Sequence, residues 1–361
     1  MKKFIITLLI LLLCSCADKN SDITFDEFKV TDEPIKVTAE PLKSTQAPIL
    51  PLHIDSKPDK YTYDQLVSDI ENLKNKYGDA IQVTKLCETF DQRNVYDIVA
   101  GNPNGNNHIM ISGAMHAREY ITTQVVMNQL CDFLELSQNN AAYKGITLNE
   151  LCKDTALHFI PMVNPDGVTL SQSGLDALLT DNAKNTVSNI CAANNFYNYE
   201  QWKANAEGTD INRNFDAGWE EYNDPKGIPA PDRYKGTFPG SSAEANALIN
   251  LTNSHNFRRT ISYHTKGSLI YWYYKQTGAV LEESKSFSQS ISDLTGYVLD
   301  GDYTAIDAAG YKDWAVYKKG IPSITIEVGG EAPDNPVPIE YLDSILIKNK
   351  DVVLETLYGL Y

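Results

Sequence analysis

Positive charge is scarce in this sequence. Its 361 residues include 31 Lys and Arg against 47 Asp and Glu. Residues 1–15, which we interpret below as a cleaved leader, hold two of the lysines and no acid, so 29 basic residues remain and the net charge becomes −18. A surface with this balance repels nucleic acid, and we therefore expect no nucleic-acid partner.

Internal repeats and long apolar runs are also lacking. No segment recurs at a fixed period, and a hydrophobic content of 42% is that of a globular protein with one large core or at most two. The apolar run from Phe4 to Leu13, in which Thr7 is the one polar residue, follows Lys2 and Lys3 and is too short to span a membrane. We interpret residues 1–15 as a secretory signal peptide.

The leader ends in "LCSC", in which Leu13 lies three residues before Cys16. This ending resembles the lipobox of bacterial lipoproteins, where cleavage leaves a lipid-modified cysteine at the new N-terminus. The resemblance implies a bacterial, extracytoplasmic protein that is held to a membrane by a lipid on Cys16. The alternative is an ordinary signal peptide with Cys16 merely nearby.

Cysteine is limited to six residues, four of which follow Cys16: Cys87, Cys131, Cys152 and Cys191. Outside the cytoplasm an even number permits disulfides. A bond between Cys131 and Cys152 would close a short loop, but four cysteines allow three pairings and the sequence does not choose among them.

Residues 16–58 lack helical or strand periodicity and are rich in Asp, Thr, Ser and Pro. We interpret them as the anchor cysteine followed by a flexible tether, and residues 59–361 as the folded domain. A short pro-segment or an added edge strand is the alternative, because "APILPLHI" is apolar enough to pack.

Strand-like and helix-like runs alternate in the rest of the chain. Residues 63–78 place Leu66, Ile70 and Leu73 at helical spacing, and a second helix is expected over about 119–136. Apolar, β-rich runs occur in "NVYDIVAG", "HIMISG", "ALHFIPMV", "RRTISYHT" and "SITIEVGG". Buried strands separated by helices predict a single α/β domain with a mixed, mostly parallel twisted sheet flanked by helices.

Polar residues follow or end several of these strands. His116 and Glu119, three apart in "GAMHAREYI", follow one strand, and His264 and Glu327 end two others. Ligands bind beyond the carboxyl ends of strands in such sheets. Two imidazoles and a carboxylate are the protein ligands of a catalytic zinc site with an open position for water, which leaves Glu327 as a base. The other histidines lack such neighbours in the sequence, and we expect them to be structural or exposed: His53, His108, His158 and His255.

Five motifs, in order, resemble those of the zinc carboxypeptidase family of the carboxypeptidase A type: "MHAREY", "MVNPDG", "DINRNFDAGW", "SYHTKG" and "PSITIEVG". The similarity covers roughly Tyr61 to Tyr361. It implies an enzyme that hydrolyses peptide bonds with one zinc ion per chain.

The resemblance also implies residue roles. His116, Glu119 and His264 would be the zinc ligands, and Glu327 the general base and acid. Two residues of "INRN", Asn212 and Arg213, correspond to residues that grip a substrate carboxylate, and Arg118 corresponds to one that lines the cleft.

The sequence departs from the family pattern at two positions. Lys203 stands nearest to the place of an arginine that stabilises the oxyanion, and a lysine supplies charge without a planar fork; the alternative is a solvated lysine beside Trp202. The family's mobile substrate-capping tyrosine corresponds best to Tyr303, with Tyr311 as a competitor.

"WKAN" and "GYKDW" are more similar to the bacterial branch that cleaves peptidoglycan stem peptides between γ-D-glutamate and a diamino acid. Lys312 falls at the family's specificity position, where a cation favours a side chain with a carboxylate. A murein peptide is therefore the expected substrate. A general carboxypeptidase acting on proteins and peptides is the first alternative, and a non-catalytic peptide- or wall-binding module is the second.

Overall fold

The computed structural model describes residues 58–300 and 308–361. The chain divides into units 1–47 and 48–361, and all described residues belong to the second. The leader, Cys16, nearly all of the tether, His53 and Tyr303 lie outside the described residues. No helix in the described ranges is long and apolar enough to cross a membrane.

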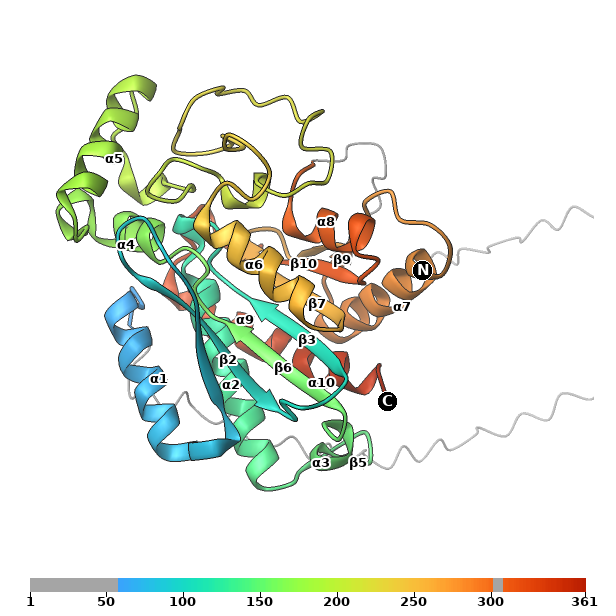
Figure 1. The fold of residues 1–361 in the computed structure, drawn as a ribbon. Helices are drawn as coiled ribbons and strands as arrows, with labels where there is room; N and C mark the ends of the chain where they lie inside the picture. Colours follow the sequence, from blue (N-terminus) through green and yellow to red (C-terminus); the bar gives the residue numbers. More distant parts are fainter. Residues whose placement is uncertain (1–57, 301–307) are drawn as a thin grey trace, which may run out of the picture. The chain divides into compact units, whose positions relative to one another are not determined.

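An eight-stranded sheet forms the centre of this unit, in the order β1-β2-β6-β3-β7-β10-β8-β9 (Figure 1). Four of its seven strand pairings are parallel, including the central run β6-β3-β7-β10. The expected mixed, mostly parallel sheet is confirmed. The strands are β1 Gln82–Glu88, β2 Asn94–Gly101, β3 Asn107–Ser112, β6 Thr155–Ile160, β7 Phe257–Thr265, β8 Leu269–Tyr271, β9 Val298–Leu299 and β10 Ser323–Val328; β4 Ala142–Tyr143 and β5 Ile146–Thr147 form a separate pair.

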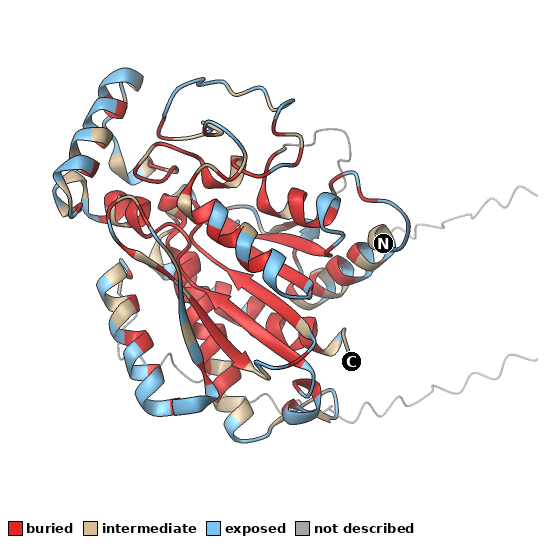
Figure 2. Ribbon diagram, in the orientation of Figure 1, coloured by how far each residue is buried: buried red, intermediate tan, exposed pale blue. Residues whose placement is uncertain are grey.

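Helices cover both faces of the sheet. One face packs against α1 Tyr63–Tyr77, α2 Ile121–Gln138, α7 Gly278–Thr295, α9 Leu342–Asn349 and α10 Val352–Tyr358. The other packs against α6 Ala243–Ser254 and α8 Tyr311–Lys318. The remaining helices are α3 Leu148–Leu151, α4 Pro165–Ser173 and α5 Asp181–Asn194. With helices on both sides, the central strands are almost wholly buried (Figure 2).

The side chains of each strand alternate between these two faces. Ile109 and Ile111 of β3 belong to the larger core on the α2 side, whereas Met110 belongs to the core beneath α6. The helix expected at 63–78 is α1, whose Leu66, Ile70 and Leu73 all enter the larger core. It ends at Gly78, where φ is +54°, a conformation that glycine adopts without strain.

The structure shows no disulfide among the described cysteines Cys87, Cys131, Cys152 and Cys191. None of the pairings that the sequence left open is formed among them. Burial raises the pKa of Cys87 and Cys152 to about 12, so these thiols are protonated and unreactive near neutral pH.

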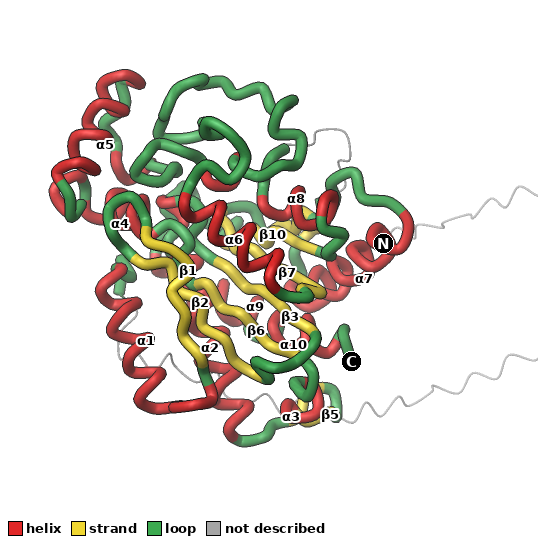
Figure 3. Tube along the Cα trace, in the orientation of Figure 1, coloured by secondary structure: helices red, strands yellow, loops and turns green. Residues whose placement is uncertain are grey.

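Parallel pairing of β3, β7 and β10 brings their carboxyl ends to the same edge of the sheet. The long segment between α5 and α6, mostly loop in Figure 3, packs against this edge. Its Lys203 carbonyl accepts a hydrogen bond from Ala117, just after β3. The predicted site residues therefore come from strand ends and from one long loop.

Candidate active site

A short turn after β3 presents His116 and Glu119. His116 is extended (φ −96°, ψ 133°) and precedes a single 3-10 turn, Ala117–Glu119, before α2 begins at Ile121. The helix expected from about residue 119 therefore starts two residues later. The turn places the two side chains together, with His116 Nδ1 2.9 Å from Glu119 Oε1.

His264 reaches the same point from β7, the neighbour of β3. Its Nδ1 lies 2.9 Å from Glu119 Oε2 and 3.0 Å from His116 Nδ1. The backbone N–H of Thr265 donates to Glu119 Oε2 at 3.2 Å and fixes that carboxylate. All three side chains are buried, and their ligand atoms lie within 4.8 Å of one another.

Asp210 lies behind His116, and sequence reasoning did not assign it a role. His116 Nε2 donates to Asp210 Oδ1 at 3.2 Å, and this carboxylate is fully buried. A carboxylate that accepts from the outer nitrogen of a ligand histidine fixes its tautomer and orientation. The sequence did contain a sign of this role, because Asp210 is an acidic residue within the family-like motif "DINRNFDAGW".

These contacts allow a test of whether a metal fits. If the Nε2 proton of His116 points at Asp210, its Nδ1 is a lone pair that faces the Glu119 carboxylate and His264 Nδ1. Burial raises the pKa of Glu119, but His116 and His264 outweigh burial and hold it below its ordinary range, so the group is ionised. An ionised carboxylate between two buried imidazoles requires positive charge at that point, which ring protons supply without a metal and a bound cation supplies in their place. An N/N/carboxylate set with one open position suits zinc.

Glu327 lies beside this cluster on β10, where it pairs in register with His264. Its Oε2 is shielded from solvent and has no hydrogen-bond partner among the described residues. Burial and the charge of Glu119 raise the pKa of Glu327 to about 7, against the lowering effects of His264, Lys203 and Arg213. A carboxyl group with this pKa can both accept and release a proton near neutral pH.

Lys203 also reaches the site. Its ammonium lies 3.8 Å from Asp210 Oδ2, and its side chain is 16% exposed. Burial raises the pKa of Asp210, but Lys203 and His116 outweigh burial and hold it well below its ordinary value. The lysine is thus mostly buried beside the metal ligands rather than solvated.

Asn212 and Arg213 occupy a 3-10 turn, Ile211–Arg213. Arg213 donates to the Asn212 carbonyl at 2.7 Å, and its guanidinium lies 5.5 Å from the Tyr222 ring centre. Asn212 Oδ1 accepts from the backbone N–H of Tyr311 at 3.0 Å, which joins this turn to the start of α8.

The remaining predicted residues lie around these turns. Arg118 donates to Gln201 Oε1 at 3.2 Å. Lys312, at the start of α8, is largely buried, and its ammonium lies 2.5 Å from Asp313 Oδ1 and 2.8 Å from the Tyr273 carbonyl. Its charge is therefore already paired. The competing capping residue Tyr311 is buried, with its hydroxyl 2.9 Å from Thr252 Oγ1 of α6.

Comparison with known proteins agrees with the fold and the site. Residues 66–338 match the model of the zinc carboxypeptidase family. The chain belongs to this family. It is therefore a zinc-dependent metallopeptidase, and the cluster of His116, Glu119 and His264 fits the ion that the family uses.

Individual relatives differ in similarity. The gamma-D-glutamyl-L-diamino acid endopeptidase 1 of Lysinibacillus sphaericus is 34% identical over 300 residues, which cover 82% of this chain and 72% of that protein. Mast cell carboxypeptidase A of Mus musculus is 23% identical, over 58% of this chain and 45% of its own length. Bovine thrombin-activatable fibrinolysis inhibitor has the same fold, with a TM-score of 0.65 at 18% identity over 83% of this chain and 97% of its own.

Proposed function

We propose that this zinc metallopeptidase hydrolyses γ-D-glutamyl–diamino acid bonds in peptidoglycan stem peptides. The observation that carries the proposal is the 34% identity, over 82% of the chain, to an endopeptidase named for that bond. Identity to mast cell carboxypeptidase A is lower and covers less of both proteins.

The proposed chemistry divides between metal and protein. When bound by His116, Glu119 and His264, zinc polarises a carbonyl and lowers the pKa of water to about 7. Glu327 takes the proton of the attacking water and delivers it to the leaving nitrogen, a role that suits a carboxyl group whose Oε2 is shielded and has no hydrogen-bond partner among the described residues. Lys203 supplies positive charge where the oxyanion develops.

Substrate binding is assigned to residues of the turn after β3, of the long segment between α5 and α6, and of α8. Arg213 offers a bidentate pair to a substrate carboxylate, and Asn212 a further hydrogen bond. Arg118 lines the cleft beside them. Lys312 favours a diamino acid with a second carboxylate, although that carboxylate would share the ammonium with Asp313 and the Tyr273 carbonyl. Tyr303 is the proposed capping residue.

One experiment separates this proposal from its alternatives. The zinc-loaded protein is incubated with defined muropeptides and with all-L peptides whose C-termini are free or blocked, and products are identified by mass spectrometry. We expect cleavage after γ-D-glutamate. Release of single C-terminal residues from all-L peptides would instead support the general carboxypeptidase, and binding of muropeptides without cleavage would support the binding module.

We also propose that the enzyme works outside the cytoplasm of a bacterium, anchored by a lipid on Cys16. The sequence of the leader and its "LCSC" ending support this location. Wild-type protein should sediment with membranes, and Cys16→Ser should impair processing or release soluble protein. Wild-type protein found entirely in the soluble fraction would refute the anchor.

A further inference from the structure

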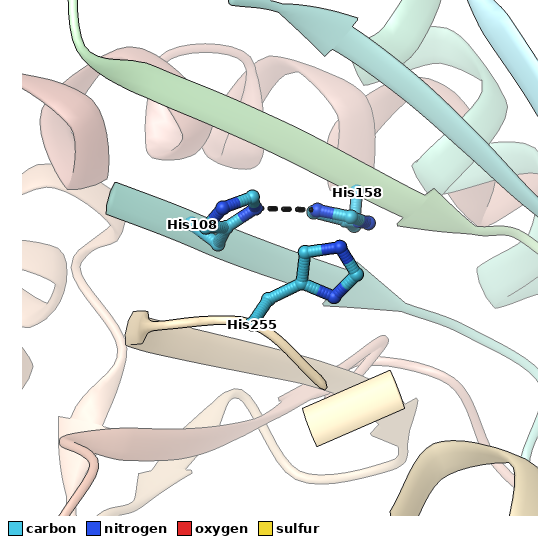
Figure 4. Close-up of side chains that lie close together, drawn as sticks. All are labelled: His108, His158 and His255. Carbon is cyan, nitrogen blue, oxygen red and sulfur yellow. Dashed lines mark hydrogen bonds between the residues drawn. The ribbon is translucent and has the colours of Figure 1, made fainter. Parts of the chain in front are cut away.

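Three histidines, His108, His158 and His255, lie close together (Figure 4), toward the opposite end of the strands from His116, Glu119 and His264. His108 lies at the start of β3, His158 lies in β6, and His255 lies between α6 and β7. Their ring centroids are 4.6 to 5.1 Å apart, and each offers a nitrogen that lies within 4.8 Å of the others. The sequence predicted structural or exposed histidines, and His108 and His158 are indeed buried and His255 exposed, but it gave no sign that the three lie together.

A buried carboxylate orients this cluster. His158 Nδ1 donates to Asp97 Oδ2 at 2.8 Å, which leaves His158 Nε2 as a lone pair 2.9 Å from His108 Nδ1. Hydrogen bonding of one ring nitrogen to a carboxylate, with the other aimed inward, is the usual arrangement of a metal-ligating histidine. His255 follows the same pattern, since its Nδ1 lies 2.8 Å from Ser254 Oγ and leaves Nε2 available.

Among the residues that the structure describes, no lysine or arginine pairs with the carboxylate of Asp97, whose ion-pair partner is His158. Asp97 is 3% exposed, and its Oδ1 has no hydrogen-bond partner among the described residues. A buried carboxylate is costly unless a positive charge compensates it. Lys85 lines the same pocket, but it is exposed and its ammonium is 2.8 Å from Glu88.

We infer that His108, His158 and His255 bind a second zinc ion, with Asp97 orienting His158. Zinc–nitrogen bonds of 2.0–2.1 Å place tetrahedral ligand nitrogens about 3.3 Å apart. The nitrogens of His108 and His158, at 2.9 Å, need to separate by only a few tenths of an ångström. His108 would change to its other tautomer, with its single proton moved through solvent from Nδ1 to Nε2, so that the ring stays neutral; the exposed ring of His255 would close on the ion.

Access also suits a metal. The three histidines and Asp97 line one pocket together with Asn250 and Ser254 of α6. The ion would tie the α6–β7 turn to β3 and β6, a stabilising role separate from hydrolysis.

Zinc stoichiometry tests the inference independently of the proposed function. Metal-free full-length protein is dialysed against low-micromolar zinc and analysed for bound metal. The wild type should hold two ions, His264→Ala one, and the double variant His264→Ala, His255→Ala none. Asn250→Ala, which changes the same pocket without removing a ring nitrogen, should hold two. His255→Ala should hydrolyse peptide at the wild-type rate.

A melting-temperature measurement distinguishes a specific zinc site of the folded protein from nonspecific zinc binding. Added zinc should raise the melting temperature of His264→Ala, because an ion that binds only the folded state stabilises it. The increase should disappear in the double variant. A wild type that saturates at one ion per chain, or a His255→Ala variant that still holds two, would overturn the second site, and neither result bears on the substrate of the active site.

Discussion

The two ends of β3 and β7 carry similar ligand clusters in different surroundings. At the carboxyl end, His116, Glu119 and His264 converge beside Glu327, whose Oε2 has no partner among the described residues. At the opposite end, His108, His158 and His255 converge beside Asp97, the only acid among the described residues that line their pocket. Asp97 accepts from His158 through Oδ2, and its Oδ1 also lacks a partner among the described residues, so the two ends differ in the number of carboxyl groups near the histidines rather than in whether one oxygen is unpartnered.

This difference shows what a metal cluster needs in order to act as a hydrolase. Both clusters can hold an ion, and both have a carboxylate behind one histidine, Asp210 at one end and Asp97 at the other. Only the carboxyl end adds a second carboxyl group with a pKa near 7 and two cations, Lys203 and Arg213, close enough to influence it. We therefore expect chemistry at the carboxyl end and structural binding at the other.

The largest expected effect comes from removing one ligand at each end. His264→Ala should lose the zinc ion of the active site, and hydrolysis should fall to background, because the metal activates the water. His255→Ala, the matched change at the other end, should keep hydrolysis. The checks are metal analysis and turnover on a muropeptide. Full zinc occupancy of the active site in His264→Ala would show that the ligand assignment is wrong.

The next effect separates binding from proton transfer. Glu327→Gln keeps the shape of the side chain but removes the base, so kcat should fall by roughly 10²- to 10⁴-fold while zinc stays bound. Turnover is measured together with zinc content, so that a loss of metal is not mistaken for a loss of the base. Near-normal turnover would mean that another group activates the water.

The positions of His264 and Glu327 were predictable from the sequence because each lies at the carboxyl end of a recognisable strand. "RRTISYHT" and "SITIEVGG" are short apolar runs, and a polar residue at the carboxyl end of such a run has few structural reasons to be there. The alternation of these runs with helix-like segments was also enough to predict the mixed, mostly parallel sheet. The edge strand β1 and the short β8 and β9 lack that strong apolar signal and were not found.

The meeting of His264 with His116 and Glu119 was predicted, but other contacts between residues far apart in the sequence were not. Asp210 and His116 are 94 positions apart, and His108 and His158 are 50 apart, so only the strand order brings them together. The pairing of Lys312 with Asp313 was also missed, because adjacent residues in a helix do not normally face each other. Local patterns thus predicted the polar residues at the strand ends, but not the carboxylates that support them or the second group of histidines.

A smaller effect should follow from the carboxylates behind the histidines. Asp210→Asn removes the charge that orients His116, and such changes typically cost 10- to 100-fold in metal affinity or activity. Asp97→Asn makes the same change at the opposite end and should leave hydrolysis unaltered. Zinc affinity is measured by competition with a chelator. Unchanged affinity and turnover in Asp210→Asn would show that this carboxylate only fills space.

The smallest effect concerns substrate choice and depends on how much of the Lys312 charge a substrate can use. Under the proposed function, γ-D-glutamyl-diaminopimelate bonds are cut much faster than bonds before C-terminal Phe, Leu or Lys. Lys312→Ala should narrow that ratio of kcat/KM by about 1 to 3 kcal/mol, the usual worth of a charge-assisted hydrogen bond. Because Asp313 already pairs with the ammonium, we expect the lower part of this range.

Lys275→Ala is the control. Lys275 lies 5.3 Å from the centre of the same Tyr274 ring that Lys312 approaches at 5.9 Å, and the Lys275→Ala variant should keep the wild-type ratio of kcat/KM values. Melting temperatures show whether leaving Asp313 without its partner disturbs the fold. A wild type that prefers C-terminal aromatic or basic residues of all-L peptides would identify a general carboxypeptidase and remove the specificity role from Lys312.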